Sequence, residues 1–597
     1  MRIRKLLRVR FVVDPFTEQE KIMAELTPMM QKYMETKEQY KDCILFYRLG
    51  DFYEMFFDDA LVASKELEIT LTGKSCGLEE RAPMCGIPYH AVEGYLSKLV
   101  SRGYKVAICE QVEDPKLAKG LVKREVIRVV TPGTNLNVQS LEAGKNNYLL
   151  SIAYTPDGIG ISAADVTTGD YYVTEVEDLK KLNDELMKYE PSEIICNEAF
   201  LVSGFDVNDL KSRLHISVNA LESHMFDDDG CRRILMKHFK VNTLIGLGVE
   251  EFPTGLLAAG ALLQYLYDTQ KTDLEHFTHI YPYLTSKYML LDSSTRRNLE
   301  LTETLREKQK RGSLLWVLDK TKTAMGARLL RNYIEQPLIE KDEMEKRLDA
   351  IQELNQDSIS RDEIREYLNP IYDLERLLSK VTYKTANPRD LIAFRNSLQM
   401  LPPIKTVLSA FEKEELTEIR EQIDGLEDIY QLIDEAIIDE PPLSIREDGM
   451  IKDQFDETID RLRSAKHDGK QWLAQLEEED RERTGIKNLK IKYNKVFGYY
   501  FEVTNSYKNL VPEDYIRKQT LANAERYTTV KGTGRHYFKC GGQVTDTGIR
   551  CLLQNPGYHC TGTGPHPEHR KSDRKAGCVC VFVVGFGTKS LCTSEVK

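Results

Sequence analysis

The sequence contains no long run of apolar residues. A membrane-spanning helix needs about 20 of them in succession, and no segment of the 597-residue chain approaches that length. Residues 1–10 are basic, but Arg8 and Arg10 interrupt any stretch that could serve as a secretion signal. Hydrophobic residues nevertheless make up 41% of the chain, which is enough for several packed cores. We therefore expect a soluble protein of several domains with no membrane as a partner.

Two motifs of nucleotide and metal chemistry are also missing. The loop Gly-x-x-x-x-Gly-Lys-Ser/Thr, which cradles nucleotide phosphates, does not occur. Gly73-Lys74-Ser75 resembles its end, but Glu68 stands where the first glycine is required. No Cys-x-x-Cys pair occurs, and Asp165 has no cluster of acidic residues around it at metal-binding spacing. The chain as written is therefore expected to hold no cofactor or metal and to show no ATPase activity.

Acidic residues outnumber basic ones, with 94 Asp and Glu against 82 Lys and Arg, so the formal net charge is -12. That balance argues against a nucleic acid as partner, because phosphate binding requires lysine and arginine. The basic residues are, however, concentrated in two segments. Residues 481–531 hold eleven basic against five acidic side chains, and residues 98–128 hold eight against four. The distribution of charge therefore leaves a nucleic-acid partner open.

The most informative stretch is a turn within residues 43–54. Residues 43–48 form an apolar run typical of a buried strand, and Gly50-Asp51-Phe52-Tyr53-Glu54 follows as a turn. Apolar residues then recur at helical spacing, at Met55, Phe56, Ala60, Leu61 and Ala63. The pattern predicts a strand that delivers Phe52 and Glu54 to the start of a helix. From the local pattern alone, Asp51 with Glu54 also fits a helix capping box, and Phe52 also fits a core residue.

Residues 45–54 closely resemble the mismatch-sensing motif of the MutS family of bacterial DNA mismatch repair proteins. Residues 85–96 and 107–111 resemble the same family. The similarity extends with few interruptions from about Met23 to about Thr529.

The resemblance gives specific roles to Phe52 and Glu54. It implies that Phe52 wedges into the minor groove and stacks on a mispaired base, while Glu54 hydrogen-bonds that base. An apolar wedge must unstack a base step, which costs a few kcal/mol and costs least where pairing is already poor. A carboxylate that faces phosphates is unfavourable unless it meets a base donor or takes up a proton. We therefore expect Glu54 to weaken binding to well-paired duplex.

The resemblance also implies partners and a compartment. The expected ligand is double-stranded DNA with mismatches or small unpaired loops, bound as the first step of mismatch repair in the bacterial cytoplasm. The intact family uses ATP and magnesium, forms homodimers and acts with downstream repair proteins, but its ATPase domain has no counterpart in this sequence. Two other interpretations stay open: a clamp-and-lever scaffold that binds DNA without mismatch specificity, and an inert product of a pseudogene.

The fold class implied by the resemblance is multidomain α/β plus all-α. Residues 1–22 are expected to be an extension outside the family, because Met23 begins a stretch that resembles the family's usual start. The further parts are an α/β mismatch-binding domain (23–130), a ribonuclease H-like connector (140–252), a long helical lever (255–450), a DNA clamp with a β-hairpin (451–512), the start of a helix returning to the lever (513–529) and an aberrant tail (530–597).

Local patterns agree with these parts. Thr131–Thr134 has the composition of a linker, and strands are predicted after it over residues 148–154, 159–166 and 171–174. From Gly255 to about Ala436 apolar residues repeat at helical spacing, and prolines divide this segment at Pro337, Pro370, Pro388, Pro402 and Pro403. Residues 489–493 and 499–503 alternate with period two around Asn494–Gly498, which predicts a hairpin.

Several residues of the predicted clamp are candidates for contacts with the DNA backbone. Lys490 and Lys492 lie two residues apart and so share one face of the first strand. The full set of candidates is Lys490, Lys492, Asn494, Lys495, Arg517 and Lys518. The alternative is a solvated strand face without a ligand.

The composition changes after Thr529. The segment holds six of the twelve cysteines and four of the eleven histidines. These are Cys540, Cys551, Cys560, Cys578, Cys580 and Cys592, with His536, His559, His566 and His569. A zinc module is one interpretation, although no ligand pair repeats at finger spacing. Out-of-frame translation is the favoured one, because a shift of one nucleotide permits a continuation that resembles the family.

Overall fold

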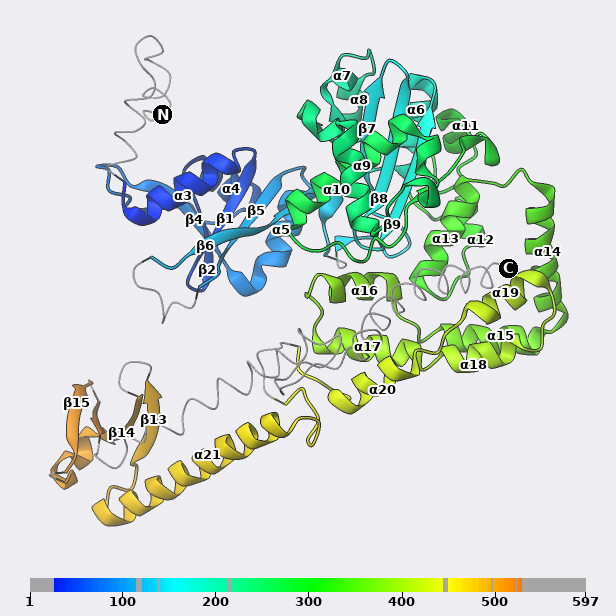
Figure 1. Ribbon diagram of the computed structural model, residues 1–597. Coiled ribbons are helices and arrows are strands. Elements are labelled where there is room, and N and C mark those ends of the chain that lie inside the picture. The colour runs from blue at the N-terminus through cyan, green and yellow to red at the C-terminus, as the bar shows by residue number, and fades with distance from the viewer. Residues whose placement is uncertain are drawn as a thin grey trace, which may run out of the picture. The chain divides into compact units, whose positions relative to one another are not determined.

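The computed structural model describes residues 26–113, 121–137, 140–212, 214, 216–443, 449–494, 498–512, 514–521 and 523–528 (Figure 1). The predictions for residues 1–22 and for the tail, residues 530–597, lie outside these residues. The described chain forms two compact units, one of residues 26–385 and 400–424 and one of residues 386–399 and 425–528. In these residues no helix combines the length and the apolar character that a bilayer crossing requires.

The larger unit begins with a six-stranded mixed sheet in the order β3-β4-β2-β1-β5-β6. Its strands are β1 (Cys43–Leu49), β2 (Phe52–Phe56), β3 (Thr72–Lys74), β4 (Ala82–Pro88), β5 (Lys105–Gln111) and β6 (Arg124–Val130). Strands β1 and β5 run parallel, and the other neighbours run antiparallel.

Side chains of β1 alternate between two cores, so both faces of this sheet are covered. Ile44 and Phe46 pack with helices α4 (Phe57–Leu67) and α5 (Val92–Val100). Leu45 and Tyr47 pack on the opposite face with α3 (Pro28–Gln39). This alternation is the period of two that a strand imposes.

A second six-stranded sheet follows in the order β11-β10-β7-β8-β9-β12. It consists of β7 (Leu149–Thr155), β8 (Gly158–Asp165), β9 (Asp170–Val176), β10 (Glu193–Asn197), β11 (Ser217–Leu221) and β12 (Tyr281–Pro282). The three strands predicted from the sequence are therefore confirmed as β7, β8 and β9. One face is covered by α6 (Leu179–Tyr189), α7 (Glu198–Leu201) and α8 (Val207–Ser212), and the other by α9 (Asp228–Phe239) and α10 (Pro253–Gln270) (Figure 1).

Helix α10, which opens the segment predicted as the lever, packs directly on this second sheet. Gly160 of β8 permits the close approach, because a Cβ there would lie 2.0 Å from the carbonyl oxygen of Thr254. The predicted linker before the sheet is also buried. Residues 132–134 form a 3-10 turn, and Glu193 accepts hydrogen bonds from the Thr131 hydroxyl and, at 3.1 Å, from the backbone N–H of Gly133.

The rest of the larger unit is helical, as the sequence predicts. Its helices are α11 (Ser293–Asn298), α12 (Leu314–Leu318), α13 (Ala324–Glu335), α14 (Lys341–Gln356), α15 (Ser358–Leu368), α16 (Leu374–Thr382), α18 (Leu401–Leu408) and α19 (Glu414–Gln422). Arg328 of α13 is 3% exposed and donates to Asp373 at 2.7 Å and to the carbonyl of Ala143 at 2.9 Å, which fixes α13 against the chain that precedes β7.

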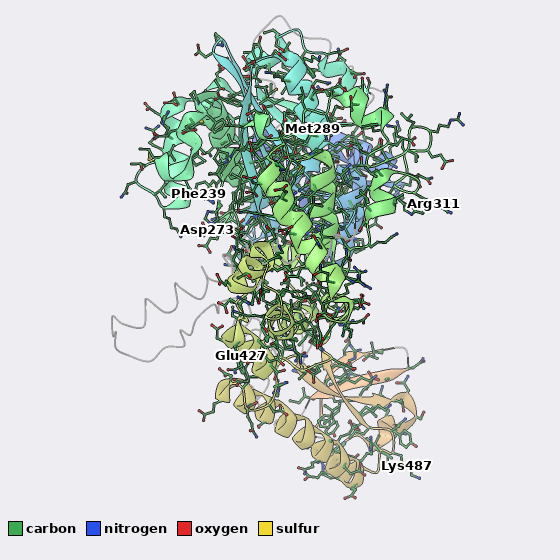
Figure 2. The ribbon with its side chains drawn as sticks, turned by 90° about the vertical axis from the view of Figure 1, so that its right-hand side faces the viewer. Phe239, Asp273, Met289, Arg311, Glu427 and Lys487 are labelled. Carbon is green, nitrogen blue, oxygen red and sulfur yellow. The ribbon has the colours of Figure 1, made fainter. Side chains whose placement is uncertain are left out.

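The smaller unit pairs helices with a four-stranded antiparallel sheet. Helix α17 (Pro388–Leu398) packs on α20 (Glu427–Ala436), and the 28-residue α21 (Glu457–Thr484) follows. The connection from α21 to the sheet passes through Lys487, labelled in Figure 2. The sheet has the order β13-β14-β16-β15, with β13 (Lys490–Asn494), β14 (Gly498–Thr504), β15 (Ile516–Thr520) and β16 (Ala524–Thr528).

Strands β13 and β14 confirm the predicted hairpin, but the helix predicted over residues 513–529 is wrong. Its residues form β15 and β16 instead. The reason is tertiary: β16 pairs with β14 and places Tyr527 beside Phe501 in the small core of this sheet. Burial of these rings outweighs the weak helical preference of the local sequence.

Candidate nucleic-acid interface

A two-residue turn joins β1 to β2 and holds Phe52 at the first position of β2. Leu49 pairs with Phe52 across the turn, and Gly50 has a φ of +60°. Positive φ at this first central position is what a type II′ hairpin turn requires, and glycine adopts it without steric cost. The backbone N–H of Tyr89 donates to the carbonyl of Asp51 at 3.0 Å, so the turn is also tied to the end of β4.

Phe52 and Glu54 therefore lie on a strand, and the prediction that they stand at a helix start is wrong. Helix α4 begins at Phe57, and its N-cap is Phe56, so Asp51 and Glu54 form no capping box. Phe52 is not a core residue either, because it is 47% exposed. The strand turns Phe52 and Glu54 to one face and the buried side chain of Tyr53 to the other.

Glu54 lies on the same face of β2 as Phe52, and its carboxylate is paired with a lysine. Its Oε2 lies 2.5 Å from the Nζ of Lys74, the last residue of β3. Its cross-strand neighbour on β4 is Gly86. A Cβ at Gly86 would lie 3.6 Å from the Glu54 Cγ and 4.0 Å from the Phe52 Cδ1, so glycine keeps the surface between the ring and the carboxylate open.

The opposite side of the hairpin is braced by a polar cluster. The Tyr53 hydroxyl donates to Glu110 of β5, and Arg48 Nη1 lies 3.2 Å from the same carboxylate. Burial, together with the bond to Glu110, raises the pKa of Tyr53, so its phenol stays protonated. The Arg48 guanidinium also stacks 3.8 Å from the centre of the Tyr89 ring. The strand that presents Phe52 thus has little freedom to move.

The second candidate surface is one face of the sheet in the smaller unit. Lys490 pairs with Glu502, and Glu502 pairs with Arg526, so these three residues share a face with Lys492. Lys492 Nζ lies 2.7 Å from Glu502 Oε1, and Arg526 Nε lies 3.8 Å from Glu502 Oε2. The hydrogen bond that Lys492 donates to Glu502 raises the pKa of Lys492. One carboxylate therefore compensates part of the positive charge of this face.

The remaining predicted clamp residues do not all join this face. Arg517 pairs with Tyr527 and so lies on the opposite face, where its Nη1 is 3.6 Å from Glu525. Lys518 stands at an irregularity between the two pairing registers of β15, and its side chain is exposed. Lys495 and the side chain of Asn494 lie outside the described residues. Arg526 was missed as a candidate, because its segment resembles a helix when read alone.

The two sequence features that resemble catalytic motifs have structural roles. Gly73 and Lys74 lie in an edge strand rather than in a phosphate-binding loop. Asp165 is fully buried, and its Oδ1 accepts hydrogen bonds from the backbone N–H and hydroxyl of Thr167 at 2.8 and 2.7 Å. Within the described ranges no group of three or more His, Cys, Asp or Glu side chains is placed to hold a metal ion.

Three models of known domains match successive parts of the chain. MutS domain I matches residues 27–139, MutS domain II matches residues 147–278, and MutS domain III matches residues 294–531. The chain belongs to the MutS family.

Curated MutS relatives are similar over the same part of the chain. The DNA mismatch repair protein MutS of Lachnoclostridium phytofermentans is 67% identical over 507 residues, which are 85% of this chain and 54% of that protein. The proteins of the same name from Ruminiclostridium cellulolyticum and Acetivibrio thermocellus are 54% and 53% identical, each over 85% of this chain and 58% of the relative. The chain thus spans little more than half the length of these relatives.

The two candidate surfaces belong to different MutS domains. Phe52, Glu54 and Lys74 fall in the match to MutS domain I, whereas the sheet with Lys490 and Lys492 falls in the match to MutS domain III. Helix α10 falls in the match to MutS domain II, together with the sheet on which it packs.

Proposed function

We propose that the chain binds duplex DNA and recognises mispaired or unpaired bases, with Phe52 as the wedge and Glu54 as the residue that contacts the base. The observation that carries this proposal is the exposure of Phe52. Phe52 is 47% exposed on a braced strand in which Tyr53 and Met55 are buried. Such a ring can enter a base step without unfolding any of its own surroundings, and unstacking is cheapest at a mismatch.

The smaller unit supplies the second half of the proposal. Its sheet of residues 490–528 would grip the DNA backbone as a clamp, through Lys490, Lys492 and Arg526. The helices of residues 293–436 would serve as a lever, and the second sheet as a ribonuclease H-like connector. In the complete protein this recognition would be the first step of DNA mismatch repair, with ATP, a second subunit and further repair proteins as partners.

The test compares Phe52→Ala with Leu61→Ala in the full chain. Leu61 lies in the same domain and is 46% exposed, so both variants remove a similar exposed apolar side chain. Binding to a short duplex with one G·T mismatch and to its matched counterpart is measured for each. We expect Phe52→Ala to abolish the preference for the mismatch and to leave matched binding nearly unchanged, while Leu61→Ala retains the preference. Equal binding of both duplexes by the unaltered chain would instead favour a scaffold without mismatch specificity.

A further inference from the structure

On the face of β2 that presents Phe52, the Glu54 carboxylate is paired with Lys74. Lys74 Nζ lies 2.5 Å from Glu54 Oε2 and 5.4 Å from the centre of the Phe56 ring. On β2, Phe56 follows Glu54 and Phe52 precedes it on the same face. The ammonium group therefore draws the carboxylate toward the buried end of the strand, on the side opposite Phe52.

The pair is also the main electrostatic restraint on Glu54. The two side chains are 17% and 33% exposed, so the contact is shielded from water more than a surface ion pair is. Among the described residues, Lys74 is the one cation paired with this carboxylate. Arg48 lies on the opposite face of the hairpin, where it is bound to Glu110. If the Lys74 ammonium group moves away from Glu54, the carboxylate therefore has no counter-ion among the described residues, and another donor must take the place of the ammonium group.

We infer that Lys74 is a specificity-determining residue, which holds Glu54 in an ion pair in the free protein and releases it when a mispaired base binds. We call this ion pair the latch. A mispaired base that stacks on Phe52 offers an N–H donor to Glu54, and this donor replaces the ammonium group. Lys74 lies on the edge strand β3, so its released side chain turns to a DNA phosphate. In a well-paired duplex no base is unstacked onto Phe52, so no base donor reaches Glu54 and the ion pair stays closed. This inference rests on the proposed function of Phe52 and Glu54.

The latch has a measurable consequence in the salt dependence of binding. Each additional lysine–phosphate contact steepens the slope of log affinity against log salt by about 0.9 in B-DNA. Lys74 adds this contact on the mismatched duplex alone. The difference between the mismatched and matched slopes should therefore contain about 0.9 units that depend on both Lys74 and Glu54.

The experiment measures both slopes for the full chain and four variants. Lys74→Met should remove the 0.9 units from the difference, because no lysine is released. Glu54→Gln should remove the 0.9 units from the difference as well, because Lys74 is then free on both duplexes. The slope for the matched duplex should itself become steeper by about 0.9. Lys74→Arg should retain the difference. Lys105→Met is the matched control, since Lys105 pairs with Asp42 at 3.0 Å in the same sheet, and it should also leave the difference unchanged.

The outcomes separate the latch from the proposed function. If the unaltered chain prefers the mismatch but Lys74→Met shows the same slope difference, the latch is wrong and the roles of Phe52 and Glu54 stand. If Lys74→Met lowers both slopes equally, Lys74 is a plain phosphate contact, which also overturns the inference. Thermal unfolding of each variant shows whether a changed slope reflects a changed fold, and Lys74→Arg supports the latch only if its melting temperature matches that of the unaltered chain.

Discussion

The hairpin that carries Phe52 and the sheet that carries Lys490 present their side chains in opposite ways. The hairpin is braced from behind by Tyr53, and its exposed ring can be reached without rearrangement. The sheet instead offers cations on a solvated face, where Glu502 already compensates part of the charge. A ring that stacks on one base must be placed accurately, because stacking depends on contact. A cation that neutralises phosphate acts over several ångströms, so its exact position matters less.

The largest effect is expected where the hairpin loses its support. Tyr53 is 5% exposed, and the centre of its ring lies 6.0 Å from the centre of the Phe46 ring. Tyr53→Ala removes this ring, and such losses cost about 3–5 kcal/mol of the free energy of unfolding. Urea unfolding, with hydrogen exchange of residues 43–56 as the local probe, measures this loss. Tyr53→Phe is the control: it loses only the hydrogen bond to the Glu110 carboxylate, and the loss of a bond to a charged group should cost about 1.5–3 kcal/mol. A cost of Tyr53→Ala below that of Tyr53→Phe would show that the hairpin is not braced by this ring.

A smaller effect is expected at the turn itself. Gly50→Ala places a Cβ in open space, since no atom lies within 4 Å, but at a φ of +60°. The change should therefore cost about 1–2 kcal/mol from backbone conformation alone. Gly94→Ala is the matched control, because its Cβ also meets nothing within 4 Å and Gly94 lies within helix α5. There alanine should stabilise by about 0.5–1 kcal/mol. Equal thermal shifts in the two variants would contradict the turn geometry.

The difference between the two regions also explains what the sequence could predict. Residues 489–492 alternate between side chains of the small core, Leu489 and Ile491, and two exposed lysines, so the period of two of this strand is visible in the sequence. Strand β2 lies in a sheet that is covered on both faces. Met55 and Phe56 are consecutive and both buried, in different cores, which conceals the strand period. The local pattern then resembles a continuation of the helix that begins directly afterwards, at Phe57.

The contacts that the sequence could not predict are those set by the order of strands. Lys74 reaches Glu54 because β3, β4 and β2 are neighbours in the sheet, although the two residues are 20 positions apart in the chain. The face that Arg526 shares with Lys492 likewise depends on the pairing of β14 with β16. Phe52 and Glu54 could be selected from the sequence because their motif is local. Their accessibility and their partners required the fold.

The smallest effects are expected in the sheet of the smaller unit, where Lys490 and Lys492 should contribute unequally to DNA binding. Lys490 is exposed, and no ion pair to it is found among the described residues, so Lys490→Gln should flatten the salt slope by about 0.9 on matched and mismatched duplex alike. Lys492 faces the same side, but its ammonium group lies 2.7 Å from Glu502. Lys492→Gln should therefore flatten the slope by less than Lys490→Gln does.

The ion pair between Lys492 and Glu502 supplies the control for this difference between the two lysines. Glu502→Gln removes the compensating charge, so it should steepen the salt slope. In that background, adding Lys492→Gln should flatten the slope by the full 0.9 units expected for Lys490→Gln alone. Titrations at several salt concentrations on both duplexes measure each slope. Neither change should alter the preference for a mismatch, because phosphate contacts carry no base information. A changed preference in Lys490→Gln would break the comparison, since it would mean that the sheet takes part in recognition and does more than hold the duplex.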